Sequence, residues 1–469
     1  MKAALNHIFF KACSAVSAET NLPSYAIGGW VRDQILGRDS KDVDIVVLGS
    51  GIDFAKKVAA KIHPKIKVNF FANFGTAQFI YQGTEYEFVG ARKESYQRNS
   101  RNPIVENGTL EDDIARRDFT VNALAISLNP NDYGEIVDIF GGVKDLDLKI
   151  LVTPLDPDTT YSDDPLRMLR AVRFASQLNF KISEESKISI QKNAPRLEII
   201  SQERIHIELN KILLSPKPSI GLDLLFQLNL LPFVLPELIE LHGVELYKGK
   251  GHKDNFYHTL QVVDNVAKVS NNLWLLWSAL LHDIAKPQTK AFSEDNGWSF
   301  HGHEVLGSRM ARTIFKRLKL PLDEPLNYVR KLVFLHLRPI ALTKETITDS
   351  AVRRLLFEAG DDIDDLLTLC QADITSKNEA KVARYLQNLE TLKIRIKEVE
   401  ERDHIKNFQP PVSGEKIMEL YNLKPSRVIG LIKNHIKEAI LDGEIANDSD
   451  EALALLERIA PKYLEENVA

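Results

Sequence analysis

Apolar residues follow two different spacings along the chain. Up to about residue 150, short apolar runs of strand length recur, including VDIVVL, TAQFIY and EYEFVG, and GIDFAKKVAAKI carries a helical spacing between two of them. Strands mixed with a few helices predict an α+β domain around one mixed β-sheet. From Asp164 onward, apolar residues recur every three or four positions. This spacing predicts that the rest of the chain is helical.

Proline and glycine residues divide the helical part into segments. LSPKPSIG and LPFVLPEL interrupt the apolar pattern, and DHIKNFQPPVSG separates a last helical piece. Such clusters are typical of boundaries between elements. We therefore predict an α+β head at 1–150, an all-α neck at 151–236, a helical body at 237–402 and a helical tail at 403–469.

Composition narrows the class of protein. The chain has 469 residues, of which 44% are apolar and 27% charged, as in ordinary globular proteins. A net charge of −5 does not indicate a nucleic-acid binder, although a local basic groove can exist within an acidic total. Two distant cysteines exclude a disulfide framework, and the apolar runs are shorter than the roughly 20 residues that span a bilayer. We expect a cytoplasmic protein without a membrane partner and leave its oligomeric state open.

Two aspartates alternate in the first apolar strand. Asp42 and Asp44 lie two positions apart in KDVDIVV, so both carboxylates project from one face of the sheet. Two like charges this close are costly unless a cation lies between them, and Mg²⁺ prefers such oxygen ligands. A third carboxylate on a neighbouring strand would complete a two-metal site. Glu87 in EYEFVGAR is the candidate.

A pair of glycines precedes these aspartates. Gly28 and Gly29 lie between a short strand and the helix VRDQILG, where backbone N–H groups can approach a triphosphate. Arg32 would add positive charge to the same place. Taken alone, the glycine pair and the two aspartates are each equally compatible with a structural role. Their order along the chain favours a nucleotide site.

Longer motifs follow in a fixed order. They are GGWVRDQILG, KDVDIVV, FGTAQF, EFVGAR, TLEDDIARRDFTVNAL, IVDIFGGVKDL, DDPLRMLRAVRFASQLNF and ERIHIELNKIL. In these motifs the chain resembles the tRNA nucleotidyltransferase and poly(A) polymerase family in its bacterial form. The resemblance covers nearly the whole chain from about residue 20. It implies a nucleotidyltransferase head followed by a helical neck, body and tail.

The resemblance assigns roles to individual residues. Asp42 and Asp44 become metal ligands, and Glu87 becomes the third catalytic acid. Asp164 and Arg167 would present hydrogen-bond edges that mimic a complementary base, because arginine offers a planar donor fork and aspartate only acceptors. DDPLRMLRAVRF is also a capped helix with proline in its first turn, which is compatible with this role. The other implied nucleotide-binding residues are Arg116, Arg117, Asp118, Asn122 and Arg170.

The implied activity is the addition of C, C and A to the 3′ end of tRNA from CTP and ATP, without a template. The polar loop RKESYQRNSRNPIVENGTLEDDIA looks full length, which favours complete CCA addition over addition of C alone. Two alternatives stay open. One is poly(A) polymerase, which shares the head and neck motifs. The other is an RNA-binding protein with an inactive head, in which the helical body carries the main activity.

A second set of candidate ligands lies in the helical body. Histidines and aspartates follow in the order H, HD, H, H and D, which resembles the HD metal-dependent phosphohydrolase superfamily. Histidines in apolar helices are often hydrogen-bonded core groups, but six matching positions favour a metal site. Imidazole and carboxylate ligands suit a divalent transition metal. The implied metal ligands are His258, His282, Asp283, His303, His336 and Asp373.

The resemblance also extends to the tail. Relatives with an HD domain resemble bifunctional enzymes that also remove phosphate from 2′,3′-cyclic or 2′-phosphorylated ends. The segment Ser413–Asp448 is similar to the C-terminal segment of these enzymes, and its cations would follow the phosphate backbone of tRNA. A solvated helix face is an equally good interpretation for each of them. These cations include Lys424, Arg427, Lys433 and Lys437.

Overall fold

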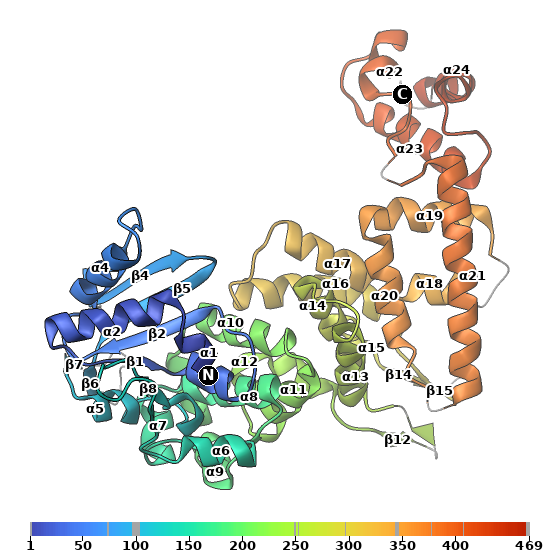
Figure 1. Cartoon of the computed structure of the whole chain (residues 1–469). Helices are drawn as coiled ribbons and strands as arrows, with labels where there is room; N and C mark the ends of the chain where they lie inside the picture. The colour runs from blue at the N-terminus through green and yellow to red at the C-terminus, as the bar shows by residue number, and fades with distance from the viewer. Residues whose placement is uncertain are drawn as a thin grey trace. The chain divides into compact units, whose positions relative to one another are not determined.

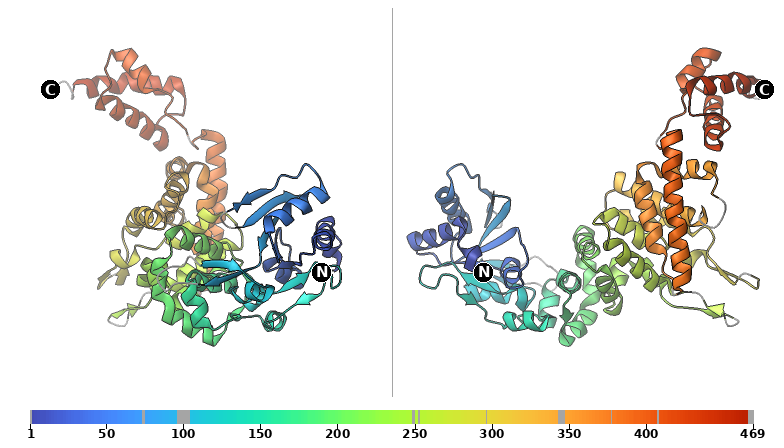
Figure 2. Two further views of the ribbon diagram at one scale, coloured as in Figure 1. Left: turned by 90° about the vertical axis from the view of Figure 1, so that its left-hand side faces the viewer. Right: turned by 45° about the vertical axis from the view of Figure 1, so that its right-hand side comes forward.

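The computed structural model of the chain describes residues 2–72, 75–95, 104–247, 250–251, 253–295, 297–342, 347–376, 378–406 and 408–465. It divides into two compact units, Met1–Pro236 and Glu237–Ala469, which are drawn in Figures 1 and 2. An α+β first unit followed by helices confirms the predicted fold class. The finer division into head, neck, body and tail stays a prediction.

A seven-stranded mixed sheet organises the first unit. Its strand order is β3-β4-β5-β2-β1-β8-β9. Only β2 and β5 pair in parallel; the other neighbours are antiparallel. The strands are β1 (Ser24–Ile27), β2 (Asp42–Val47), β3 (Asn69–Phe71), β4 (Thr76–Tyr81), β5 (Thr84–Gly90), β8 (Ala125–Ser127) and β9 (Ile136–Val137).

Two helices, α2 (Ile8–Thr20) and α4 (Gly51–Ile62), cover one face of this sheet (Figure 1). Phe9 of α2 stacks on Tyr86 of β5 with ring centroids 3.6 Å apart. Phe54 of α4 lies 6.2 Å from Phe88, again between ring centroids. Each buried aromatic side chain contributes roughly 1.5–3 kcal/mol. This aromatic core occupies one face, so the alternating polar residues of β2 and β5 project from the other.

The remaining elements of the first unit are short segments of the head followed by helices. The head segments are α1 (Lys2–Leu5), α3 (Gly29–Ile35), β6 (Arg92–Ser95), β7 (Ile104–Asn107), α5 (Leu110–Ala115), η2 (Thr120–Asn122), α6 (Gly142–Leu148) and β10 (Ile150–Leu151). The later segments are α7 (Pro157–Asp163), α8 (Leu166–Leu178), β11 (Lys181–Ile182), α9 (Glu184–Asn193), η3 (Ala194–Ile199), α10 (Gln202–Leu213), α11 (Pro218–Gln227) and α12 (Leu231–Val234).

A buried ion pair joins α8 to α10. Arg173 and Glu208 lie 3.0 Å apart, and their side chains are 6% and 5% exposed. Burial lowers the pKa of Arg173 to about 10, with the positive charge of Arg170 adding to the effect and Glu208 opposing it. The pair therefore fixes the packing of α8, the helix whose N-terminus follows Asp164.

Glu208→Ala is expected to lower the free energy of unfolding by about 3–5 kcal/mol, because Arg173 would stay buried without a counter-charge. Urea denaturation followed by circular dichroism measures this change. Glu184→Ala is the matched control, since Glu184 is 78% exposed and pairs with Lys187 at 2.7 Å. An exposed pair of this kind contributes at most about 1 kcal/mol. Equal losses in both variants would contradict the structural role of the buried pair.

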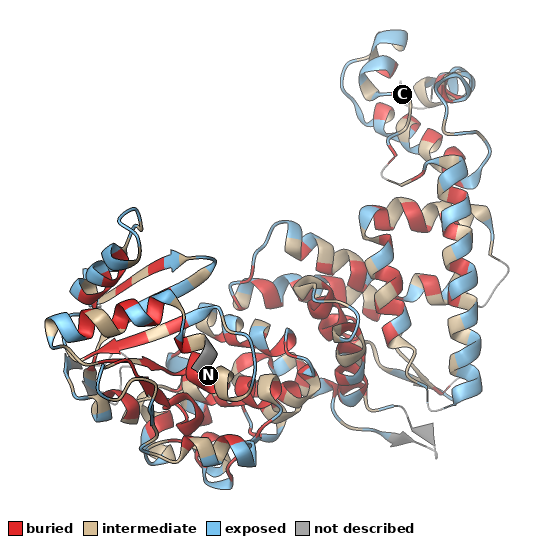
Figure 3. Ribbon diagram, viewed as in Figure 1, coloured by how far each residue is buried: buried red, intermediate tan, exposed pale blue. Residues whose placement is uncertain are grey.

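Helices make up most of the second unit, and their buried sides face one another (Figure 3). The helices from residue 236 to residue 403 are η4 (Pro236–Leu241), α13 (Asn255–Ala267), α14 (Leu273–Leu281), α15 (Lys286–Thr289), α16 (His303–Arg317), α17 (Glu324–Leu335), α18 (Leu337–Leu342), α19 (Asp349–Ala359), η5 (Gly360–Asp362), α20 (Ile363–Asp373) and α21 (Glu379–Asp403). The last helices are α22 (Gly414–Tyr421), α23 (Arg427–Asp442) and α24 (Ser449–Glu465). No helix within the described residues is long and apolar enough to cross a membrane.

The prediction that only helices follow Asp164 is wrong in detail. β11 pairs in parallel with β10, and two short hairpins occur in the second unit. The hairpins are β12 (Leu246–Tyr247) with β13 (Lys250–Gly251) and β14 (Ala291–Ser293) with β15 (Gly297–Ser299). Phe292 and Trp298 face each other across the second hairpin, 5.2 Å apart between ring centroids. Strands of two or three residues are too short to show an alternating pattern in the sequence.

Candidate functional site

Strands β2 and β5 bring the three predicted acids to one face of the sheet. Asp44 pairs directly with Glu87 in the parallel register, and neighbouring strands lie about 4.8 Å apart. Val43 and Ile45 are buried on the opposite face. Asp42 is exposed at the start of β2, whereas Asp44 is half-buried. The alternation in the sequence is therefore present in the structure.

The electrostatics of these acids fit a divalent cation. Burial raises the pKa of Asp44; Arg117 opposes this shift, and the nearby charge of Asp42 adds to it. Burial and the charge of Asp44 likewise raise the pKa of Glu87. A cation held between the carboxylates would offset this penalty. All three donors are carboxylate oxygens, which hard divalent ions prefer.

Gly28 lies against the acids and has a backbone angle φ of +81°, which favours glycine. A Cβ atom there would lie 2.8 Å from an Nη atom of Arg117 and 3.5 Å from Oδ2 of Asp44. Its N–H donates to the carbonyl of Leu124 at 3.0 Å. This N–H is therefore already engaged, and the expectation that backbone N–H groups at Gly28 and Gly29 approach a triphosphate stays a prediction. Gly29 begins α3.

Asp113, which the sequence analysis missed, holds two of the predicted arginines. Its side chain is fully buried and accepts hydrogen bonds from Arg116 at 2.5 Å and Arg117 at 3.3 Å. Nε of Arg117 is buried and has no hydrogen-bond partner among the described residues. Asp113 on α5 precedes Arg116 and Arg117 by three and four residues, and this spacing is the signal that could have identified it.

A second network joins the head to α8. Arg170 of α8 pairs with Asp118 at 2.6 Å, and Asn122 donates to Asp118 at 3.0 Å. Burial by itself would raise the pKa of Asp118, but Arg170 and the hydrogen bonds outweigh it and lower the pKa to about 2. Arg32 is buried, donates to Asn122 at 2.7 Å and pairs with Asp33 at 2.9 Å. Arg32 and Asn122 thus bind each other in this structure, and their nucleotide-binding roles stay predictions.

The N-terminus of α8 positions the two predicted base-selecting residues. Asp164 accepts a hydrogen bond from the backbone N–H of Leu166 at 3.2 Å. Arg167 donates to the carbonyl of Arg116 at 2.7 Å, which ties it to the head. The hydrogen bond at the start of α8 does not remove Asp164 from the site, because Asp164 and Arg167 both line the cavity described next.

One cavity of about 280 Å³ brings acids, arginines and base-selecting residues together. The predicted residues that line it are Asp44, Glu87, Arg116, Arg117, Asp118, Asp164, Arg167 and Arg170. Its other lining residues, which the sequence analysis missed, are Thr76, Val89 and Arg92. The predicted residues outside its lining are Asp42, Gly28, Gly29, Arg32 and Asn122. The polar loop of residues 92–115 is only partly covered, because 96–103 lie outside the described residues.

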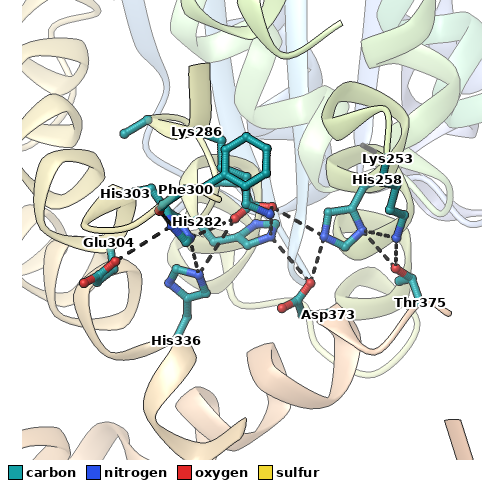
Figure 4. Close-up of polar contacts among 12 residues, drawn as sticks. Lys253, His258, His282, Lys286, Phe300, His303, Glu304, His336, Asp373 and Thr375 are labelled. Carbon is teal, nitrogen blue, oxygen red and sulfur yellow. Dashed lines mark hydrogen bonds and ion pairs between the residues drawn. The ribbon is translucent and has the colours of Figure 1, made fainter. Parts of the chain in front are cut away.

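The second unit gathers all six predicted metal ligands, and Figure 4 shows the four histidines with Asp373 around one centre. Asp283 is central: its Oδ2 lies 3.1 Å from Nε2 of His282 and 3.5 Å from Nε2 of His258. Its Oδ1 lies 3.3 Å from Nε2 of His303. His336 completes one possible ligand group with Asp283 and His303. Asp373 contacts Nε2 of His258 at 2.8 Å.

Backbone carbonyls orient three of these imidazoles. Nδ1 of His282 lies 2.7 Å from the carbonyl of Ala279. His303 and His336 make the same contact with the residue three positions earlier, at 2.6 Å each. A proton on Nδ1 leaves Nε2 free to bind a metal. Nε2 of His282 is buried and lies 3.1 Å from Oδ2 of Asp283, which fits a metal shared between them.

The protonation states of His258, His336 and Asp373 suit a bound cation, whereas that of His282 does not by itself. Burial lowers the pKa of His336 to about 4 and lowers that of His258. At His282 the effect of burial is outweighed by Asp283, which raises the pKa. Burial by itself would raise the pKa of Asp373, but the hydrogen bond from His258 and the other nearby charges lower it to about 2. Anionic carboxylates and neutral imidazoles are the forms that bind metals.

Two lysines and a threonine around this centre were not identified from the sequence. Lys286 pairs with Asp283 at 2.6 Å. Nδ1 of His258 lies 2.8 Å from Nζ of Lys253 and 2.9 Å from Oγ1 of Thr375. Lys286 follows Asp283 by three positions, a spacing that could have indicated it; Lys253 and Thr375 carry no comparable signal.

Family models match three segments of the chain. Residues 24–152 match "Poly A polymerase head domain", and residues 179–241 match "Probable RNA and SrmB- binding site of polymerase A". Residues 255–377 match "HD domain".

Curated relatives carry the names of tRNA nucleotidyltransferases. An A-adding tRNA nucleotidyltransferase from Deinococcus radiodurans is 32% identical over 362 residues, 75% of this chain and 80% of the relative. A multifunctional CCA protein from Cupriavidus metallidurans is 33% identical over 310 residues, 64% of this chain and 71% of the relative. An A-adding tRNA nucleotidyltransferase from Aquifex aeolicus is 40% identical over 200 residues, 41% of this chain, but the match spans only 24% of that longer protein.

A solved structure is similar over most of the chain. It is a tRNA nucleotidyltransferase complexed with a primer tRNA and an incoming ATP analog, with 25% identity and a TM-score of 0.57. The likeness covers 81% of this chain and 99% of that one. The identity to the relative from Deinococcus radiodurans, the fold and the motifs all indicate the same protein family. The chain belongs to the tRNA nucleotidyltransferase and poly(A) polymerase family, in a form that carries an HD domain.

Proposed function

We propose that the chain adds C, C and A to the 3′ end of tRNA, using CTP and ATP and no template. The observation that carries this proposal is one cavity that Asp44 and Glu87 line together with Asp164 and Arg167. Acids for nucleotidyl transfer and hydrogen-bond edges for choosing a base thus meet in one space. The structure neighbour with tRNA and an ATP analog supports the same substrates.

Asp42, Asp44 and Glu87 are proposed to hold Mg²⁺. When bound, the ions would polarise the phosphoryl oxygens and favour the deprotonated form of the attacking 3′-hydroxyl. Arg116 and Arg117 line the cavity and would bind the negatively charged triphosphate. The buried carboxylate of Asp113 holds both guanidinium groups in place before the nucleotide arrives.

Base selection is assigned to Asp164 and Arg167. Asp164 accepts a hydrogen bond from the first residue of α8, and Arg167 lies on α8 and donates to the backbone of Arg116. An aspartate acceptor beside an arginine donor fork can match the hydrogen-bonding edge of cytosine or adenine. A fixed pair on a buried helix would select a base without a complementary nucleic-acid strand.

A second candidate is addition of the terminal A alone. The names of two relatives, from Deinococcus radiodurans and Aquifex aeolicus, favour it. The two activities use the same acids and differ only in whether CTP is accepted.

One assay separates these activities. A tRNA transcript lacking its last three nucleotides is supplied with CTP alone, ATP alone and both, and a transcript ending in CC is supplied with ATP. We expect two C residues from CTP, then one A, and then arrest. Growth only of the CC-ending transcript would select A addition, and unlimited addition of A would select poly(A) polymerase.

For the second unit we infer a phosphohydrolase site that holds a divalent transition metal on His258, His282, Asp283, His303, His336 and Asp373. The buried, preoriented imidazoles around Asp283 support it. When bound, the metal would activate a water molecule for attack on a phosphoester. Lys286 would neutralise part of the negative charge of Asp283. We also infer a cytoplasmic location, because Cys13 and Cys370 are both buried and unpaired.

A further inference from the structure

Positive charge is concentrated in one part of the second unit. Residues 303–342 contain eight lysines and arginines but only three acidic residues, a net charge of +5 in a chain whose total is −5. This segment consists of α16, α17 and α18. A charge of one sign concentrated on a few helices creates a local potential that the total charge conceals.

Five of these eight cations have no acidic partner within the described part of the chain. Arg317, Lys331 and Arg338 pair with Glu237, Asp362 and Glu358. The unpaired cations, here called the α16–α17 basic surface, are Arg309, Arg312, Lys316, Lys319 and Arg330.

The spacing of these residues places most of them on one side of α16. Arg309, Arg312 and Lys316 are three and four positions apart, and all three are exposed. Residues at this spacing lie one above the other on a helix surface. Lys319 lies two residues beyond the end of the helix. The neighbouring positive charges therefore repel one another when no ligand is bound. A linear array of negative charges would remove this repulsion.

A groove of about 390 Å³ lies beside this row. Arg309 and Arg330 line it, and Arg330 is held by a hydrogen bond to the carbonyl of Ser308 at 3.1 Å. Phe334 also lines the groove and is 37% exposed. RNA-binding surfaces combine two elements: cations that contact phosphates, and an aromatic ring nearby on which a base can stack.

We propose that the α16–α17 basic surface binds the phosphodiester backbone of the tRNA substrate. The proposal rests on the proposed function for the identity of the RNA. It assigns an RNA contact to the outer surface of the HD domain, outside the matched RNA-binding segment at 179–241 and outside the nucleotide cavity. Charge complementarity to a polyanion is the argument for this occupant.

The tail offers a weaker alternative. Residues 413–448 hold five cations and six acidic residues. Lys437, one of the cations expected to follow tRNA, pairs with Glu438 at 3.1 Å. The acidic residues Glu438, Asp442 and Glu444 line the groove in the tail, and Arg354 pairs with the first two. The roles of Lys424, Arg427 and Lys433 stay predictions.

The test measures how tRNA binding by the full-length protein depends on salt. Binding of a labelled tRNA transcript is followed by fluorescence anisotropy over a series of KCl concentrations. Arg312→Gln with Lys316→Gln is expected to weaken binding and to reduce the slope of log affinity against log salt by about 2, because each of the two cations neutralises one phosphate. The matched control is Lys393→Gln with Lys397→Gln on α21, which removes two charges at the same spacing. Those lysines pair with Glu390 and Glu401, so the slope should stay at the wild-type value.

Equal slopes for the two double variants would overturn the proposal, once thermal melts show that both are folded. Binding of the Arg312/Lys316 variant to anionic phospholipid vesicles is measured as well. If this variant loses vesicle binding but keeps the wild-type salt slope for tRNA, the proposal is also overturned. Nucleotide addition by the wild-type protein is measured separately. If addition is absent but the slope still falls only in the Arg312/Lys316 variant, the RNA surface is supported and the proposed function fails.

Discussion

Asp44→Asn is expected to reduce incorporation of both C and A by roughly 10²–10³-fold or more, as expected when a charged group is removed from a preorganised site. Asparagine has nearly the shape of aspartate, so the strand pairing with Glu87 should persist. The change removes the anionic oxygen that a cation between β2 and β5 requires. Asp42→Asn should act in the same direction, because Asp42 projects from the same face of β2. Single-turnover incorporation of labelled CTP and ATP measures the decrease.

This decrease should not come from unfolding. Burial and the neighbouring charges of Asp42 and Asp113 raise the pKa of Asp44, so its anionic form is destabilised in the folded protein. Because the folded-state pKa is raised, the ionised carboxylate opposes folding above its normal titration range. The melting temperature of Asp44→Asn should therefore be at least that of the wild type.

Asp53→Asn serves as the control for this experiment. Asp53 is exposed in the first turn of α4, on the sheet face opposite the acids. Normal incorporation is expected for this variant. Wild-type rates of C and A addition by Asp44→Asn would refute the assignment of the nucleotidyl-transfer site.

Alternation within one strand is the feature that the sequence predicted most directly. Asp42 and Asp44 share a face because residues two apart always do so in a strand. Glu87 was also accessible as a third acid, since it lies in another clear strand pattern, EYEFVG. Asp113 was missed although its spacing of three and four residues before Arg116 and Arg117 is visible in the sequence. Arg92 was not identified because its position depends on how β6 packs beside the sheet. Such packing between elements leaves no periodic signal.

The sequence analysis also could not predict which hydrogen-bond partners the candidate residues have inside the protein. Arg32 was predicted from its charge, yet Asp33 and Asn122 occupy its guanidinium group. Gly28 was predicted because a missing side chain lets backbone N–H groups approach a triphosphate, and the structure adds that the position has a positive φ and lies close to Arg117. In both cases the residue type was informative, but its hydrogen-bond partner depends on tertiary structure. Motif spacing does not specify such partners.

In the HD domain the sequence predicted the ligand set, and the structure adds its surroundings. Six residues from five segments meet at one centre because apolar helices α13, α14, α17 and α20 pack together. The carbonyl contacts of three histidines follow from their place at helix ends. Lys253 is different, since only the tertiary fold brings it to His258.

Asp283→Asn should remove the transition metal from the HD domain and leave nucleotide addition intact. Asp283 is the residue shared by both possible ligand groups, His258 with His282 and His303 with His336. Replacing it removes an anionic oxygen from each group at once, whereas loss of one histidine would affect a single group. Metal content after purification, measured by mass spectrometry, should fall to background, and hydrolysis of 2′,3′-cyclic nucleotides should fall with it. Addition of C and A should continue at the wild-type rate, because the acids of the nucleotide site lie on β2 and β5.

The isosteric amide is preferred to alanine because Asp283 is only 2% exposed and pairs with Lys286. Asp364→Asn is the control, since Asp364 is exposed on α20, the helix that also carries Asp373. Full metal content in Asp283→Asn would exclude the cluster around Asp283 as the metal site. Loss of C and A addition together with the metal, in a variant whose melting curve is unchanged, would mean that the metal of the HD domain supports the nucleotidyl-transfer reaction. Metal content and nucleotide addition, measured on the same variant, therefore test two points. They test whether Asp283 is a metal ligand and whether the HD domain and the nucleotide site act independently.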